Sequence, residues 1–117
     1  MDLDHAIQAH AEWKLKLRGA ISKQESVDAA TISVDNRCPL GQWLHGEAQQ
    51  KLGGMKSHAE CMQKHAAFHR EAGKVAMVIN TRKYADADLM LDSDTPFALA
   101  SSAVTLAIMH LKKESGL

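Results

Sequence analysis

The stretch SHAECMQKHAAFHREAGKVAMVIN, residues 57–80, decides the fold class of this chain. Its less polar side chains recur at steps of three or four residues, which predicts one face of a long helix. That face consists of Met62, His65, Ala66, His69, Ala72, Gly73, Ala76 and Ile79. Ser57 and Glu60 have the spacing of a capping box, so we expect the helix to begin near Ser57. Asn80 or Thr81 is its expected end.

Similar periodicity predicts helices on both sides of this one. We expect a first helix over residues 2–22, a short helix from Pro39 to Leu52 with a break at Gly46, a short helix over residues 84–91, and a last helix from Thr95-Pro96 onward. Alternation with a period of two residues is weak throughout, so we expect no sheet. The simplest architecture is all-α, an antiparallel four-helix bundle with a short extra helix that begins after Cys38.

The composition limits the classes of function. The chain of 117 residues fits one domain, residues 1–117, and its 14 basic and 14 acidic residues balance. We therefore expect no binding to nucleic acid or to anionic membranes. No apolar stretch reaches the roughly 20 residues of a membrane span. The acidic N-terminus lacks the apolar region of a secretory signal, and two cysteines do not make a disulfide scaffold, so we expect a cytoplasmic protein.

His65 and His69 form an HxxxH motif on the long helix. They differ by about 40° around the helix axis and by about 6 Å along it, so both imidazoles can reach one ion. The same spacing also occurs for purely structural reasons. His10 lies on the apolar stripe of the first helix, where a core histidine bonded to a backbone carbonyl is the simple alternative. Three neutral imidazoles buried together would leave acceptors unsatisfied, and a metal ion would satisfy them.

Cys38 is the candidate fourth ligand because it precedes Pro39 at a helix start, where backbone N–H groups favour the thiolate. A small buried cysteine is the alternative. Three histidines and one cysteine make a complete tetrahedral set for Zn(II), which points to sensing or structure before catalysis. Cys61 is a rival ligand, but it lies about 12 Å along the helix from His69, and one ion cannot bind both. We interpret Cys61 as a core residue.

The other histidines have simpler interpretations. We interpret His58 as a residue at a helix start and His5, His45 and His110 as surface or packing residues.

Trp13, Gly41 and Trp43 are predicted to support the site. Trp13 comes one turn after His10, and Trp43 comes five residues after Cys38. We expect both indoles to be core aromatics that restrict water around the ligands. Gly41 would allow the backbone to pack closely near Cys38.

Three motifs together resemble the chemoreceptor zinc-binding (CZB) domain: HxxW at residues 10–13, CxLGxW at 38–43 and HxxxH at 65–69. The resemblance implies a four-helix bundle that binds one zinc through His10, Cys38, His65 and His69. It also implies a bacterial cytoplasmic domain, a homodimer, and signal transduction with a chemoreceptor in chemotaxis or with a diguanylate cyclase, in cis or in trans. No such signalling domain follows, so we expect a stand-alone protein or an excised domain.

Several functions are compatible with these residues. The first hypothesis is a sensor of zinc, or of an oxidant such as hypochlorous acid through redox sensing at the Cys38 thiolate. A structural zinc protein is an alternative. A zinc hydrolase would use His10, His65 and His69 without Cys38, and it would need a general base such as Glu12 or Glu71. No paired Glu-x-x-His motif supports a di-iron bundle, and no CxxCH motif supports covalent haem.

Overall fold

The computed structural model describes residues 1–117 and is all-helical, as the sequence predicts, with eight helices and no strand. The helices are α1 (Leu3–Ala11), α2 (Trp13–Lys23), α3 (Ala29–Ile32), α4 (Pro39–His45), α5 (Glu47–Leu52), α6 (Lys56–Asn80), α7 (Tyr84–Met90) and α8 (Pro96–Ser115). The molecule is elongated and measures 43 × 24 × 19 Å.

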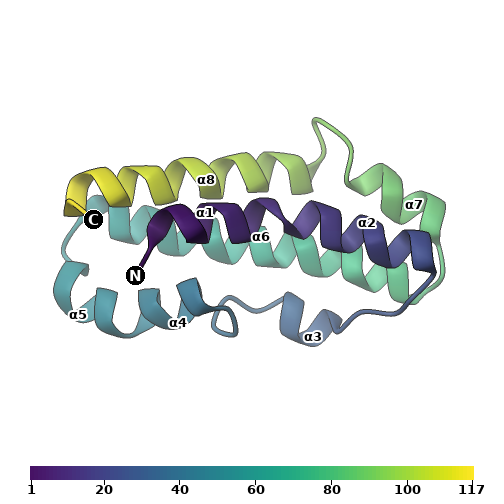
Figure 1. Ribbon diagram of the computed structural model, residues 1–117, viewed down its shortest axis with the longest axis horizontal. Helices are drawn as coiled ribbons and strands as arrows, with labels where there is room; N and C mark the ends of the chain where they lie inside the picture. Colours follow the sequence, from purple (N-terminus) through teal and green to yellow (C-terminus); the bar gives the residue numbers. More distant parts are fainter.

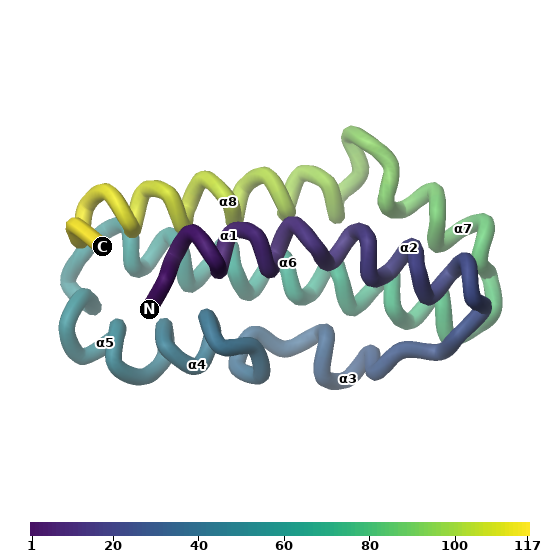
Figure 2. Tube along the Cα trace, in the orientation of Figure 1, coloured from purple at the N-terminus to yellow at the C-terminus, as the bar shows by residue number.

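The helices lie in four rows along the long axis (Figure 1). One row is α1 followed by α2, the second is α3 to α5, and the third and fourth are α6 and α8. Successive rows run in opposite directions, which is easiest to follow along the tube of Figure 2. The long helix α6 packs most extensively against α8 and also contacts α3 and α2, while α1 packs against α8. The site-bearing helices α1, α4 and α6 therefore meet in one half of the molecule.

Most predicted helix boundaries are close to the observed ones. Pro39 is the first residue of α4, and the Cys38 side chain accepts the N–H of Gly41 as the N-cap. Thr95 caps α8 in the same way, through the N–H of Ala98. The predicted helix over residues 2–22 is two segments that meet at Glu12, whose backbone keeps a right-handed helical conformation.

The predicted capping box at Ser57 is wrong. The long helix α6 begins at Lys56 after Met55, which makes no side-chain cap. The Ser57 hydroxyl instead donates to the Glu114 carboxylate at 2.6 Å, across to the end of α8. A partner 57 residues away competes for the hydroxyl, and local spacing cannot reveal such a partner.

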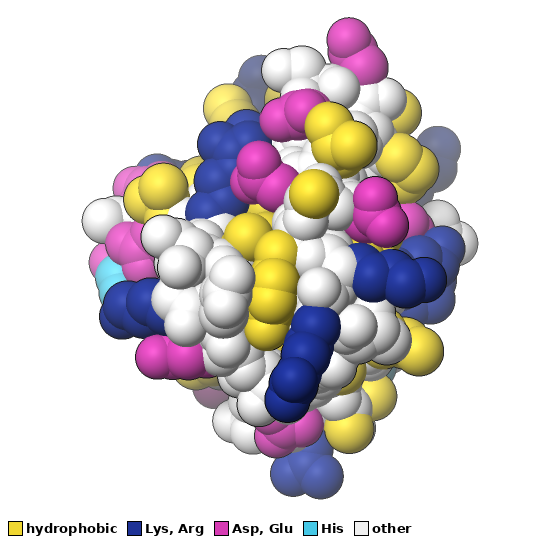
Figure 3. Space-filling model, turned by 90° about the vertical axis from the view of Figure 1, so that its right-hand side faces the viewer, with side chains coloured by type: hydrophobic (Ala, Val, Ile, Leu, Met, Phe, Trp, Pro, Cys, Tyr) yellow, Lys and Arg dark blue, Asp and Glu magenta, His cyan; other side chains and the backbone are white.

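The surface is polar and mixed in charge. At the end formed by α7 and the end of α2, basic and acidic side chains alternate with scattered apolar ones (Figure 3). This pattern agrees with the balanced composition and shows no single-sign patch at that end. None of the eight helices combines the length and the apolar composition that a bilayer span requires.

Candidate metal centre

Four residues from three helices bring one ligand atom each to a common point. His10 lies in α1, Cys38 caps α4, and His65 and His69 lie one turn apart in α6. Their ligand atoms all lie within 4.8 Å of one another. The three imidazoles are buried and Cys38 is half-buried. The four residues that the sequence predicts as ligands are thus gathered in one group.

The Nε2 atom of His65 is at the centre of the group. It lies 3.1 Å from Nε2 of His10, 3.0 Å from Nε2 of His69 and 3.2 Å from Sγ of Cys38. Sγ of Cys38 lies 3.6 Å from Nε2 of His69 and 3.8 Å from Nε2 of His10. A tetrahedral zinc, bound about 2.0–2.1 Å from nitrogen and about 2.3 Å from sulfur, would space its ligand atoms roughly 3.3–3.6 Å apart. The donor set and its spacing therefore fit Zn(II).

Hydrogen bonds at the Nδ1 atoms of two imidazoles fix the tautomer, so that the lone pair of Nε2 faces the centre of the group. Nδ1 of His10 donates to the Ala6 carbonyl at 2.7 Å, and Nδ1 of His69 donates to the Ile32 carbonyl at 2.9 Å. Each neutral ring then presents Nε2 as an acceptor. Such backbone partners are typical of metal-bound histidines because they fix the tautomer and the ring orientation.

His65 differs because its Nδ1 is buried without a hydrogen-bond partner. If Nε2 carried the proton of His65, Nδ1 would be a bare buried acceptor. If Nδ1 carried it, three Nε2 lone pairs would face one another. Either arrangement leaves polar atoms unsatisfied in the interior, which is costly. A cation at the centre would remove the repulsion between the lone pairs.

Burial keeps these imidazoles neutral. Desolvation, with a smaller contribution from the nearby His69 and His10, lowers the pKa of His65 from its ordinary value of 6.5 to about 2. Desolvation also lowers the pKa of His10 and that of His69, although hydrogen bonds to backbone carbonyls oppose the shift in both. Neutral imidazole is the form that binds a metal ion.

The thiol of Cys38 behaves differently from the sequence expectation. The predicted helix-start hydrogen bonds are present, and those from Gly41 and Leu40 lower its pKa. Desolvation is nevertheless the largest effect, and it raises the pKa of Cys38 above its ordinary value. Without a cation the protonated thiol is therefore favoured. Sequence reasoning missed this because it could not show how deeply the segment before α4 is packed.

Two glycines allow the segment that carries Cys38 to approach α6 closely. A Cβ on Gly41 would lie 1.5 Å from the Asp35 carbonyl oxygen and 3.0 Å from Cε1 of His65. A Cβ on Gly73 would lie 2.1 Å from Oγ of Ser33. The predicted close packing at Gly41 is thus present, and Gly73 is a second contact of this kind that we did not predict from the sequence.

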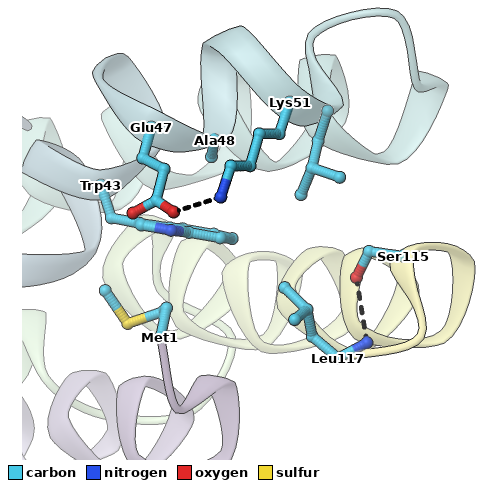
Figure 4. A pocket seen from close by; sticks show the side chains of 8 residues that line it. Met1, Trp43, Glu47, Ala48, Lys51, Ser115 and Leu117 are labelled. Carbon is cyan, nitrogen blue, oxygen red and sulfur yellow. Dashed lines mark hydrogen bonds and ion pairs between the residues drawn. The ribbon is translucent and has the colours of Figure 1, made fainter.

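The two predicted tryptophans lie in different environments. Trp13 is half-buried against the core, and the Lys16 ammonium lies 4.9 Å from the centre of its ring. Trp43 lines a cavity of about 150 Å³ between α5 and the two chain ends (Figure 4). Met1 and Leu117 also line this cavity, and none of the four grouped residues does.

Cys61 and the remaining histidines lie outside the group. Cys61 is fully buried in the core, and desolvation raises the pKa of its thiol to about 12. His58 lies in the first turn of α6, as predicted, but it is also buried, and its Nε2 donates to the Leu44 carbonyl at 3.0 Å. His45 and His110 are exposed and pair with Asp35 and Glu60, and His5 is exposed.

Comparison with known proteins agrees with this geometry. The family model of the chemoreceptor zinc-binding domain matches residues 10–76, which is more than half of the chain. The chain belongs to this family. The matched region begins at His10 and includes Cys38, His65 and His69. Searches of curated proteins and of solved structures gave no match. This CZB domain is therefore a zinc-binding domain by family and carries a donor group that suits zinc.

Proposed function

We propose that this CZB chain is one cytoplasmic sensor domain, residues 1–117, built as an antiparallel four-helix bundle. It binds one Zn(II) through His10, Cys38, His65 and His69. The single observation that carries this proposal is the convergence of three Nε2 atoms and one Sγ atom within 4.8 Å. The family match to residues 10–76 supports the choice of zinc.

When bound, zinc supplies a cation that three nitrogen lone pairs and a thiolate can share. His10 contributes from α1, Cys38 from the start of α4, and His65 and His69 from the middle of α6. The Ala6 and Ile32 carbonyls hold two of the imidazole rings in position. The four side chains thereby connect three rows of helices, and loss of one contact loosens the packing of the row that carries it.

Cys38 is the proposed site of oxidation. Its sulfur is half-buried, whereas Cys61 is fully buried and has a strongly raised pKa. In reaction with hypochlorous acid, the Cys38 thiolate sulfur forms a bond to oxygen and loses two electrons, and the chlorine leaves as chloride. The product is a sulfenic acid, which is a poorer metal ligand than a thiolate. The segment from Ser33 to α5 is then free to move from α6.

The proposed output is signal transduction. We infer that the domain acts as a homodimer and controls a signalling protein, either a chemoreceptor or a diguanylate cyclase, in cis or in trans. The family description names chemoreceptors, and this name supports the proposal. Movement of the row α3 to α5 would be the change that a partner detects.

A regulatory role fits the residues around the site better than hydrolysis does. Sγ of Cys38 fills the fourth ligand position that a hydrolase would keep for water. Glu71 pairs with Lys74, and Glu12 is exposed. Neither carboxylate is therefore positioned to act as a general base beside the four grouped residues. We therefore propose that the chain is not an enzyme.

The proposal is tested by titrating zinc-loaded protein with hypochlorous acid while a chromogenic chelator reports released zinc. Release should follow oxidation of Cys38, and hydrogen exchange should accelerate in α3 to α5 and much less in α6. A Cys61→Ser variant, which keeps every proposed ligand, should respond as the wild type does. Zinc retained after Cys38 is oxidised would contradict the oxidant sensor and leave a structural zinc site.

A further inference from the structure

The cavity beside Trp43 lies apart from the metal centre and between two parts of the molecule. Trp43 belongs to α4, and Ala48 and Leu52 belong to α5. Ser115 is the last residue of α8, and Leu117 follows it. Figure 4 shows the Trp43 side chain extending into the space between α5 and the end of α8. A molecule in this cavity would therefore contact α8 and the row α3 to α5 at the same time.

The size of the cavity restricts its occupant to a small molecule. Its volume is about 150 Å³, well below the roughly 300–1,000 Å³ of sites for drug-sized ligands. Five of its eight lining residues are hydrophobic, including Trp43, Leu52 and Leu117. An apolar cavity of this size accepts a single benzene ring. The indole of Trp43 favours an aromatic occupant, because aromatic rings pack well in offset or edge-to-face contacts.

The charged side chains of the wall favour a neutral occupant. Glu47 and Lys51 are the only charged side chains among the lining residues. They pair with each other, with 2.7 Å between Oε1 of Glu47 and Nζ of Lys51 (Figure 4). A charged ligand would lose its hydration in an apolar cavity without gaining an unpaired partner of opposite charge, which is costly.

The Ser115 hydroxyl favours an occupant that carries a hydrogen-bond donor. Its hydrogen is directed to the Leu111 carbonyl at 2.6 Å, and its oxygen accepts the N–H of Leu117 at 3.3 Å. A hydroxyl oxygen has two acceptor lone pairs, so one lone pair of Ser115 remains. An O–H or N–H group of the occupant would donate to it, whereas an occupant with acceptors alone would find the hydroxyl hydrogen already used.

We propose that this cavity binds a small neutral molecule with one aromatic ring and one hydrogen-bond donor, and that its occupant favours the zinc-bound arrangement of α3 to α5. Cys38 caps α4, the same helix that carries Trp43. An occupant that holds α4 and α5 against α8 therefore keeps Cys38 near the histidines. Such coupling is reciprocal, so zinc also strengthens binding of the occupant. The coupling rests on the movement of α3 to α5 proposed above, whereas binding in the cavity does not.

Phenol is the probe, because it is a single ring with one donor, and toluene is its counterpart without the donor. Each is titrated into the zinc-loaded full chain, while ¹H–¹⁵N NMR follows the indole N–H signals of the two tryptophans. Trp43 lines the cavity and Trp13 does not, so a saturable shift is expected at Trp43 and a much smaller one at Trp13. Shifts that do not saturate, or that are equal at both indoles, would overturn the site.

Ser115→Ala tests recognition of the donor. Loss of the hydroxyl should weaken phenol binding about two- to tenfold and leave toluene binding unchanged. Ser101→Ala is the matched control, because Ser101 is a half-buried serine of the same helix that does not line the cavity. It should bind both probes as wild type does, and both variants should keep the circular dichroism of wild type. Equal losses for phenol and toluene in Ser115→Ala would contradict recognition of the donor.

Phenol titrations with and without zinc test the coupling. The zinc-loaded chain should bind phenol about fivefold more tightly than the metal-free chain, and saturating phenol should raise the zinc affinity by the same factor. Equal phenol affinity in the two forms would contradict the coupling. A chain that binds phenol but no zinc would contradict the metal site alone, and a chain that binds zinc but no phenol would contradict the cavity site alone.

Discussion

The α6–α8 side of the molecule and the row α3 to α5 are held in place by different means. Helices α6 and α8 have 25 and 20 residues and meet along fully buried side chains such as Val75, Val104 and Leu111. Helices α3, α4 and α5 have only four, seven and six residues. Helices this short are unstable by themselves, so their position depends on contacts with α6.

Some of those contacts are polar and lie beside buried apolar side chains such as Ile32 and Leu44. Nδ1 of His69 bonds the Ile32 carbonyl, and Nε2 of His58 bonds the Leu44 carbonyl. Cys38 reaches the histidine group from the same row. This difference indicates that the apolar side, α6 with α8, can maintain the fold while the polar side, the row α3 to α5, responds to a ligand. Loss of the metal should therefore loosen α3 to α5 and leave α6 and α8 packed together.

Acid should have the largest effect on the polar side. The pKa values of His10, His65 and His69 are lowered by burial, so the unfolded chain binds their protons at higher pH than the folded chain does. Stability should fall as the pH drops below 6.5, and for His65 this loss continues toward pH 2. Urea unfolding at neutral and mildly acidic pH, with and without chelator, measures this loss of stability. Unchanged stability below pH 6.5 would contradict buried neutral histidines.

The apolar side is tested by Ile108→Ala. Ile108 is fully buried on α8, and its truncation should cost about 2–5 kcal/mol of unfolding free energy. The zinc content of the folded variant should not change, because Ile108 lies outside the histidine group. Chemical denaturation and metal analysis measure both quantities, with exposed Leu15→Ala as the control. Loss of zinc at full stability would contradict the division between the two sides.

Gly41→Ala tests the close approach of the segment that carries Cys38. The new Cβ would meet the Asp35 carbonyl and the His65 ring, so we expect a loss of about 1–3 kcal/mol and weaker zinc binding. Gly19→Ala is the matched control, since nothing lies within 4 Å of its Cβ, and it should be neutral or stabilising. Normal zinc affinity in Gly41→Ala would show that this approach is not required.

The smallest expected effect is at His58. His58→Met removes the hydrogen bond to the Leu44 carbonyl and should cost about 1 kcal/mol. Hydrogen exchange should accelerate in α4 before it does so in α8. The exposed His110→Ala provides the comparison and should change neither quantity. Uniform acceleration in both helices would mean that His58 stabilises the whole core instead of α4.

Much of the fold and of the site could be predicted because the signals are local. Pro39 predicted the first residue of α4, Thr95 predicted the cap of α8, and the HxxxH spacing predicted two imidazoles on one helix face. The grouping of His10 and Cys38 with them was predicted because His10 lies on the apolar stripe of the first helix and Cys38 precedes Pro39 at a helix start.

The remaining features depend on contacts between distant residues. Ser57 has a capping-box pattern, but the carboxylate of Glu114 takes its hydroxyl. His58 lies at a helix start, as interpreted, but its burial and its bond to the Leu44 carbonyl were not predicted. The pKa of Cys38 depends on burial in the folded chain, which outweighs the local helix-start effect. None of these contacts leaves a pattern in nearby sequence.

The most direct test of the account is native mass spectrometry of wild type, Cys38→Ala and Cys61→Ala after a mild chelator challenge. The account predicts one zinc per chain in wild type and in Cys61→Ala, and loss of zinc from Cys38→Ala. All three proteins should remain helical by circular dichroism. Equal zinc retention by wild type and Cys38→Ala would contradict the four-ligand site and would leave the three histidines as the metal-binding group.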